Sequence, residues 1–422
     1  MSTAFTNREI VSQLWTDIER RGDELVDLVS NLVRIPSMLG DEAPVQHWIA
    51  NYMRASGLQT DVWDLDQLVT SLPNAGNSGF PFAGRPNVTG IRKGSGTGRS
   101  LIMNGHVDVV SPDPVNAWNY DPWGAEIVGN RMYGRGAYDM KSGVALNLFL
   151  GRLLNDLDIP LAGDFTLHSV IEEECTGNGA LAAARRDRAD AVIVTEPSFS
   201  AVTMAHLGVI WFKVHITGRS AHAGWAWQGV NAISKAVPVI QALHRLNDSF
   251  NDQVHPLYAD QHHPINLNIG VIQGGDWPST VPGSCTLHCR VSFFPDVKIE
   301  SLRQQIEDTV AQASATDEWL TSNPPIVTYD GFHTAGSSLD DDEPFLAVLE
   351  AAHSRSIESP LGRRYATAVN DMRYYIFEGM PATCYGAEGG NGHAADEWLN
   401  LDSLQPVAKS LADFIVNWCG IE

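Results

Sequence analysis

The sequence predicts an α/β protein with a mostly parallel sheet covered by helices on both faces, into which a smaller α+β domain is inserted. From residue 101 to residue 195, patterns typical of buried strands alternate with patterns typical of helices, the order of a parallel sheet with helical connections. Near residue 206 the order changes to β-α-β-β-α. The chain has 422 residues, too many for one hydrophobic core. We therefore predict a larger domain from residues 1–205 and 329–422, and an inserted domain from residues 206–328.

The composition excludes several classes of protein. A hydrophobic content of 44% and a charged content of 18% are typical of a folded globular chain. The 28 basic and 50 acidic residues give a net charge of -22, which repels nucleic acids and anionic membranes. We therefore expect neither a nucleic-acid nor a membrane partner.

The five cysteines indicate a reducing compartment. Their number is odd and no Cys-x-x-Cys pair occurs, so free thiols are expected. The first residues contain no apolar signal core, and the chain contains no run of ~18 apolar residues. These features predict a soluble, cytoplasmic protein.

The first part of the chain carries two amphipathic helix patterns. Apolar residues recur at helical spacing over residues 10–33 and stop before Pro36. A second helix pattern runs from about Val45 to Gly57 and leads into a strand at 58–63. The further elements expected in the larger domain are strands at 101–106, 164–171, 191–195 and 382–385, and helices at 140–154, 179–186, 344–355 and 401–419.

The inserted domain has its own succession of elements. Residues 209–217 alternate between apolar and polar side chains, as a half-buried strand does, and residues 231–246 form an amphipathic helix pattern. Two further strand patterns, 265–273 and 285–294, precede a helix pattern at 299–313. These elements form a unit that can fold around a core of its own.

Polar side chains follow the apolar strand that begins at Leu101. The strand pattern ends at His106, and Asp108 lies two residues later, so both side chains leave the chain on the same side. A neutral imidazole is a good zinc ligand, and a carboxylate beside it can orient the ring. In isolation, a hydrogen-bonded His/Asp pair in a turn would be the better explanation of these two residues.

Four further polar clusters occur at strand ends or in glycine-rich loops. Asp139 lies in a glycine-rich turn before a helix, where it is either an N-cap or a carboxylate that bridges two metals. Glu173 and Glu174 follow a strand, and alternation points them in different directions. One could bind a metal while the other acts as a base, although a solvated acidic run is the alternative. Glu196 ends another strand, and His393 lies in a glycine-rich loop.

Together and in this order, the five clusters resemble the dinuclear zinc amidohydrolases. That family includes acetylornithine deacetylase, succinyl-diaminopimelate desuccinylase, aminoacylase and the bacterial glutamate carboxypeptidase. The resemblance extends from about residue 20 to the C-terminus, and it implies two divalent ions, Zn²⁺ or alternatively Co²⁺ or Mn²⁺. It implies that His106, Asp139 and Glu196 hold one ion, that Asp139, Glu174 and His393 hold the other, that Asp108 orients His106, and that Glu173 is the general base.

The resemblance also covers the inserted domain, which it implies is a lid that forms a homodimer. His222, in the motif Gly-Arg-Ser-Ala-His-Ala-Gly, matches the lid histidine that stabilises an oxyanion in the site of the partner subunit. Asn268 and Arg290 match positions that hold a substrate carboxylate in relatives, a role that suits the bidentate fork of arginine. Two departures, Ala395 in place of a common proline and Cys289 in place of a frequent acid, leave the substrate open.

The implied reaction is metal-dependent hydrolysis of an amide bond in a small molecule, first of all deacylation of an N-acyl amino acid. A dipeptidase or carboxypeptidase and a deformylase of a heterocyclic amine are alternatives within the family. A non-catalytic binding protein on the same fold is a further alternative, against which the complete ligand set and Glu173 argue. The tryptophans near the site motifs suggest an aromatic pocket, with ordinary packing as the alternative: Trp118, Trp123, Trp225, Trp227 and Trp277.

Overall fold

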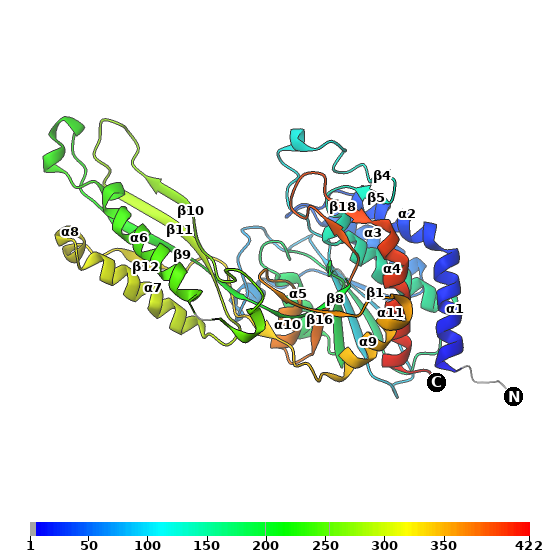
Figure 1. Ribbon diagram of the computed structural model, residues 1–422. Helices are drawn as coiled ribbons and strands as arrows, with labels where there is room; N and C mark the ends of the chain where they lie inside the picture. The colour runs from blue at the N-terminus through cyan, green and yellow to red at the C-terminus, as the bar shows by residue number, and fades with distance from the viewer. Residues whose placement is uncertain (1–5, 199, 253) are drawn as a thin grey trace. The chain divides into compact units, whose positions relative to one another are not determined.

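Figure 1 shows the computed structural model, which describes residues 6–198, 200–252 and 254–422. The chain divides into two compact units, each with its own sheet. Unit 1 comprises the chain up to Met204 with Leu339–Arg364 and Asn370–Glu422, and unit 2 comprises Ala205–Ser338 and Tyr365–Val369.

The unit boundaries differ somewhat from those that we predicted. The first unit boundary follows Met204, beside the predicted position after residue 205. The second follows Ser338, further along the chain than the predicted position after residue 328. The second boundary lies later than predicted because the short strand β13 (His333–Thr334) pairs with β9 of unit 2. A two-residue strand carries no periodic signal. The other short strands near these boundaries are β8 (Ala201–His206), β14 (Ser337–Ser338) and β15 (Gly362–Ala366).

The core of unit 1 is a sheet with the strand order β1-β2-β6-β3-β7-β16. Neighbours from β6 to β16 are parallel, whereas β1, β2 and β6 pair with one another in antiparallel fashion. β3, β6 and β7 are buried along their whole length, as inner strands of a sheet covered on both faces are, including the polar residues of β3 and β6. The prediction of a mostly parallel sheet is confirmed. In sheet order, the strands are β1 (Gln59–Trp63), β2 (Asn87–Arg92), β6 (Phe165–Val170), β3 (Leu101–His106), β7 (Ala191–Val194) and β16 (Ala382–Cys384).

Helices cover both faces of this sheet (Figure 1). Gly151 of α4 packs against Leu167 of β6 on one face. On the other face, Tyr375 of α10 donates a hydrogen bond to Asn104 of β3 at 2.9 Å. The helices of unit 1 are α1 (Asn7–Arg20), α2 (Gly22–Val33), α3 (Ala43–Ala55), α4 (Ser142–Asp156), α5 (Asn178–Arg186), α9 (Pro344–Ser356), α10 (Met372–Phe377) and α11 (Leu404–Cys419).

Two helices of unit 1 differ from the predicted elements. Residues 10–33 form α1 and α2 rather than one helix, because Arg21 between them has φ -104° and ψ 19°. The apolar spacing continues through this junction, so the sequence pattern resembles that of a single helix. Helix α10 was not predicted, since six largely apolar and aromatic residues are too few to show a helical period.

A smaller sheet of unit 1 joins two loops that are far apart in the sequence. Its strand order is β17-β18-β5-β4. Because β18 (Trp398–Asn400) pairs with β5 (Arg131–Tyr133), the loop that precedes β18 lies beside the loop that follows β5. The first of these loops carries His393, and the second carries Asp139. The remaining strands are β4 (Glu126–Val128) and β17 (Gly389–Gly390).

Unit 2 is an α+β unit, as predicted. Its strands follow the order β10-β11-β9-β12, and all neighbours are antiparallel. Helices α6 and α7 pack against each other, and their buried residues share one core with the sheet. The bounds are β9 (Gly208–Thr217), β10 (Leu267–Gly274), β11 (Ser284–Phe293), β12 (Ile326–Thr328), α6 (Ala232–Phe250), α7 (Ile299–Ser314) and the short α8 (Glu318–Ser322).

The structure also describes the cysteines and the lengths of the helices. All five cysteines lie within the described residues and are free thiols. Within the same part of the chain, the structure contains no helix with the length and hydropathy needed to cross a membrane.

Candidate metal centre

The candidate site of unit 1 lies at the carboxyl ends of parallel strands. β3 ends at His106, β6 is followed by the run Glu172–Glu174, and β7 is followed by Glu196 after one residue. Because β6, β3 and β7 are adjacent and parallel, their carboxyl ends meet at one edge of the sheet. The strand order therefore places His106 between the two groups of glutamates.

Asp139 lies between two histidines. Its Oδ1 is 3.4 Å from Nε2 of His106, and its Oδ2 is 3.4 Å from Nε2 of His393. Oε1 of Glu196 lies 3.5 Å from the same nitrogen of His106, and Oε2 of Glu174 lies 3.0 Å from that of His393. Each histidine thus faces a glutamate of its own and shares Asp139 with the other histidine. The peptide bond that follows Asp139 is cis.

This donor set fits divalent metal ions. Nε2 of His106 is buried and makes no hydrogen bond to the described residues, although carboxylate oxygens surround it. Asp139 and Glu174 raise the pKa of His393 to about 10, so the surrounding charges favour a cation here. Imidazole nitrogens together with carboxylate oxygens suit Zn²⁺, and also Co²⁺ or Mn²⁺.

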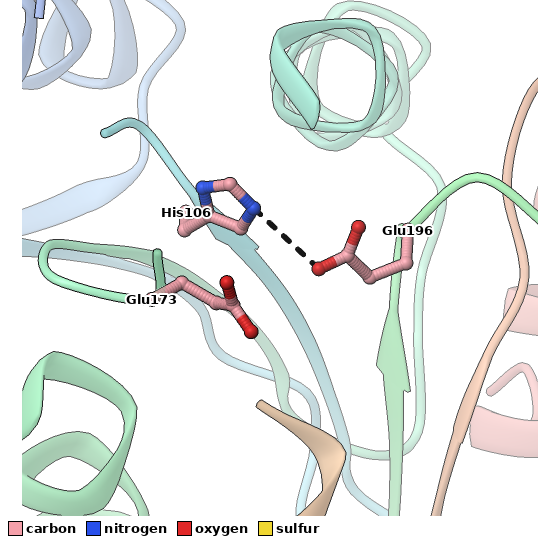
Figure 2. A group of neighbouring side chains, drawn as sticks. All are labelled: His106, Glu173 and Glu196. Carbon is pink, nitrogen blue, oxygen red and sulfur yellow. Dashed lines mark ion pairs between the residues drawn. The ribbon is translucent and has the colours of Figure 1, made fainter. Parts of the chain in front are cut away.

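The side chain of Glu173 also lies at the carboxyl edge of the sheet, but its charged neighbour is Arg373. Its carboxylate lies within 4.8 Å of ligand atoms of His106 and Glu196, and Figure 2 shows it directed toward both residues. Nη1 of Arg373 lies 4.0 Å from Oε1 of Glu173. Burial raises the pKa of Glu173 well above its ordinary value. The distances alone would admit Glu173 as a ligand, but the nearby guanidinium distinguishes it from Glu174, which faces His393.

Asp108 supports both the histidine and the glutamates. Its main-chain oxygen lies 2.9 Å from Nδ1 of His106, a contact that directs Nε2 toward Asp139. Its buried carboxylate accepts hydrogen bonds from the main-chain N–H of Glu173 at 3.1 Å and of Glu174 at 2.9 Å. Asp108 therefore orients His106 through its main chain and fixes the two glutamates through its side chain.

Glu397 holds the loop of Asp139, a role that the sequence pattern did not reveal. This fully buried carboxylate accepts hydrogen bonds from the main-chain N–H groups of Gly136, Tyr138 and Asp139 at 3.0 to 3.1 Å. It also pairs with Nη1 of Arg135 at 2.6 Å. The signal in the sequence is an acid that shares a loop with His393, but its partners lie 258 to 262 residues earlier.

Two further charged residues of unit 1 were not singled out by the sequence pattern: Arg373 in α10 and Asp371 directly before that helix. Arg373 is buried and donates a hydrogen bond to the main-chain oxygen of Thr176 at 3.3 Å, in the loop that carries Glu173. Asp371 is fully buried, lies 3.4 Å from Nδ2 of Asn104, and has a pKa that burial raises to about 7. Charged residues within an apolar, aromatic segment are the signal that could have identified them.

The other three candidate residues, His222, Asn268 and Arg290, belong to unit 2. His222 is exposed and accepts a hydrogen bond at Nδ1 from the N–H of Gly224 at 3.0 Å, at the start of the turn Ala223–Gln228. Asn268 of β10 and Arg290 of β11 are direct partners across the sheet, so their side chains share a face. The structure therefore groups Asn268 with Arg290, and it groups the five candidate ligands in unit 1.

Known relatives resemble the chain over most or nearly all of its length. It is 30% identical over 442 residues to N-formyl-4-amino-5-aminomethyl-2-methylpyrimidine deformylase of Bacillus subtilis, an alignment that covers 97% of this chain and 98% of the relative. It is 27% identical over 340 residues to acetylornithine deacetylase of Vibrio cholerae, with coverage of 77% and 83%.

Solved structures of other proteins share the fold of this chain. A family model then identifies the family to which the chain belongs. A tripeptidase of Staphylococcus aureus has a TM-score of 0.72 at 20% identity, covering 94% of this chain and 98% of the other. A di-peptidase of Saccharomyces cerevisiae has a TM-score of 0.75 at 13% identity, covering 97% and 98%. The model of peptidase family M20/M25/M40 matches residues 102–417. The predicted resemblance is therefore confirmed: the chain belongs to peptidase family M20/M25/M40 and is a metal-dependent hydrolase of amide bonds.

Proposed function

We propose that the protein removes a small acyl group from an amine, using two divalent ions at the carboxyl edge of the unit 1 sheet. The position of Asp139 carries this proposal, because its carboxylate presents one oxygen to each histidine. A carboxylate in this position would be able to serve two ions, one beside each histidine. Zn²⁺ is proposed ahead of Co²⁺ and Mn²⁺. The proposed ligands are His106, Asp139 and Glu196 for one ion, and Asp139, Glu174 and His393 for the other.

Glu173 is the proposed general base. Two divalent ions held by these residues would polarise the acyl oxygen and lower the pKa of a water molecule. Glu173 takes a proton from that water and passes it to the nitrogen of the leaving amine. The water oxygen bonds to the acyl carbon, the carbon–nitrogen bond breaks, and a carboxylic acid and a free amine leave. The main-chain bond of Glu173 to Asp108 and the guanidinium of Arg373 support this role.

The surface of unit 2 supports the proposal that two copies of the chain associate. β10 lies at an edge of its sheet and exposes Val271 and Ile272, and α6, which packs beside it, exposes Ile233 and Val237. An edge strand with exposed apolar side chains favours pairing with a strand of another chain. In the proposed homodimer, His222 of one chain donates a hydrogen bond to the oxyanion that develops in the site of the other.

A formylated heteroaromatic amine is the first candidate substrate. The deformylase relative aligns with nearly the whole chain, and the deacetylase relative with a smaller part of it. Trp225, which is 57% exposed, has its ring centroid 5.4 Å from that of His222. Trp277 is 67% exposed on the loop whose Thr280 forms a β-bridge with His222. Exposed aromatic rings around His222 suit the flat ring of a heteroaromatic amine.

An N-acyl amino acid is the second candidate, which the pairing of Asn268 with Arg290 favours. An amide and a guanidinium on one face of a sheet can together hold a carboxylate. The first candidate has no such carboxylate. Binding by Asn268 and Arg290 is therefore expected only for the second candidate.

A panel of substrates tests the proposal. The zinc-loaded and cobalt-loaded enzymes are offered N-formyl-4-amino-5-aminomethyl-2-methylpyrimidine, N-acetylornithine, N-acetyl aromatic amino acids and dipeptides. Release of the free amine and of the free acid is measured for each. We expect the highest kcat/KM for the formylated pyrimidine. A preference for acetylated amino acids that Arg290→Met removes would favour the second candidate, and turnover of dipeptides alone would refute the acyl-group proposal.

A further inference from the structure

Glu172, the first of three consecutive glutamates, takes no part in the proposed chemistry, yet it is fully buried. Its Oε1 accepts hydrogen bonds from Nη1 of Arg85 at 2.8 Å and from Oγ of Ser78 at 2.8 Å. Its Oε2 accepts hydrogen bonds from Oγ1 of Thr176 at 2.7 Å and from Nδ2 of Asn178 at 3.3 Å. Both oxygens are therefore occupied by protein donors, so this carboxylate holds the surrounding chain in place.

Arg85 joins Glu172 to a second buried carboxylate. Its Nε donates to Oε2 of Glu42 at 2.8 Å, and its Nη2 donates to Oε1 of the same residue. Arg85 is only 5% exposed, and Glu42 is fully buried. The planar guanidinium can serve two carboxylates at once, which the ammonium of a lysine cannot do in the same geometry. Because Glu42 directly precedes α3, Arg85 ties the glutamate loop to the start of that helix.

The main chain of Glu172 sets the direction of the loop. Its φ of 69° lies in the left-handed region, which residues with a Cβ rarely adopt. Its carbonyl oxygen accepts the N–H of Thr176 at 2.9 Å and so closes a turn. The N–H groups of Glu173 and Glu174 then meet the carboxylate of Asp108. The contacts of the Glu172 side chain thus stabilise an unfavourable conformation from which the two functional glutamates project.

We propose that Arg85 is a positioning residue that acts through Glu172 on Glu173 and Glu174. The inference rests on the proposed roles of Glu173 as the base and of Glu174 as a ligand. Without the guanidinium fork, a single cationic group cannot bond to both Glu42 and Glu172, and the buried carboxylate of Glu172 loses the N–H of Arg85 that it accepts. The turn then relaxes and carries the carboxylate of Glu173 away from the water that it deprotonates. A displacement of ~1 Å can reduce turnover about 100-fold.

Arg85→Lys tests this inference, because it keeps the charge and removes the fork. At saturating Zn²⁺, we expect kcat to fall ~10–100-fold while KM stays within about twofold of the wild-type value. Calorimetric titration of the metal-free protein with Zn²⁺ should show that one of the two ions binds ~10-fold more weakly, because Glu174 shares the loop. Glu172→Gln, which alters the other end of the same contact, should change these quantities in the same direction.

Arg355→Lys is the control for the loss of an arginine fork that binds a buried carboxylate, although Arg355 itself is 49% exposed. Arg355 of α9 donates two hydrogen bonds of 2.6 Å to the buried Asp413 of α11, and neither residue belongs to the strand ends or loops that carry the site. This variant should lower the midpoint of thermal unfolding but leave kcat and Zn²⁺ affinity unchanged. All kinetic measurements are made well below both unfolding midpoints.

A double variant separates the failure of this inference from the failure of the proposed function. If Arg85 acts through Glu173, Arg85→Lys should cause little further loss of kcat once Glu173→Gln has removed the base. Equal losses in both backgrounds would overturn the positioning role, and so would an Arg85→Lys enzyme with the kcat of Arg355→Lys. High activity of Glu173→Gln by itself would instead show that the base is misassigned.

Discussion

The metal centre of unit 1 and the His222 loop of unit 2 differ in how far their functional residues are enclosed: of the proposed ligands only His393 is exposed, whereas His222 and the whole turn Ala223–Gln228 are exposed. At the metal centre, His106 is fully buried, and the main-chain N–H of Asp139 is held by the buried Glu397 at 3.0 Å. In unit 2, His222 is exposed, and its neighbour Trp225 is 57% exposed. The first group is fixed by the fold of its own unit, and the second stands on the surface of its unit.

The difference in exposure distinguishes metal ligands, which their own unit holds in place, from a surface histidine that is available to a partner. A metal centre works when supporting contacts hold its ligands in place before the ions bind. An exposed imidazole beside an exposed indole has few such contacts, and exposed aromatic groups of this kind mark interaction surfaces. We therefore expect substitutions at the metal centre to act within one chain. Substitution of His222 should act on a partner chain.

The largest effect is expected for Asp139→Asn. Because Asp139 faces both histidines, its replacement should weaken the binding of both ions and reduce turnover to background. That loss exceeds the ~100–10,000-fold expected of a single general base. Metal analysis after gel filtration in zinc-containing buffer, together with steady-state kinetics, measures both quantities.

Asp61→Asn is the control for the loss of one carboxylate. Asp61 is exposed on β1 and pairs with Arg186, so this variant should keep about two ions per chain and near-normal turnover. Two tightly bound ions in active Asp139→Asn would contradict the bridging role. Wild-type activity that survives removal of all metal by a strong chelator would contradict the metal centre as a whole.

The second effect separates the base from the ligands. Glu173→Gln should retain about two ions and lose ~100–10,000-fold in kcat, because one residue serves both the water and the leaving amine. Glu174→Ala should instead lose one ion, since it removes a carboxylate that lies 3.0 Å from His393. Metal content and kcat are compared in the two variants. If Glu173→Gln kept more than about a tenth of the activity, another residue would be the base.

The sequence predicts those site residues whose positions follow from the secondary-structure element that carries them. An apolar strand followed by His106 or Glu196 places a polar side chain at a sheet edge, and parallel order places those edges together. No local rule links residues that meet only in the folded chain. Glu397 holds the Asp139 loop across 258 residues, and Arg85 lies 87 residues before Glu172.

The same limit explains the errors in the predicted elements. The break at Arg21 leaves the apolar spacing of α1 and α2 intact, so periodicity could not detect it. The strand β13 is too short to alternate, and the end of unit 2 was therefore placed too early. For β13, the deciding contact is its pairing with β9, a distant segment of the chain.

The smallest of these effects is expected for His222→Ala. An imidazole that donates to a developing oxyanion contributes ~100–1,000-fold in turnover, and His222 is not one of the proposed metal ligands. We therefore expect a large fall in kcat with unchanged metal content. His244→Ala, which removes an exposed histidine from α6 of the same unit, should leave both quantities near the wild-type values.

Mixing subunits tests whether His222 acts on a partner chain. His222→Ala and Glu173→Gln proteins are each nearly inactive under the proposal, but a mixed dimer has one site with an intact base from one chain and an intact histidine from the other. After subunit exchange, confirmed by native mass spectrometry of a size-labelled pair, the mixture should recover up to about a quarter of wild-type activity, because half of the dimers are mixed and each has one complete site. A mixture that stays inactive after exchange would contradict the action of His222 on a partner chain. A fully active monomer in solution would contradict it as well.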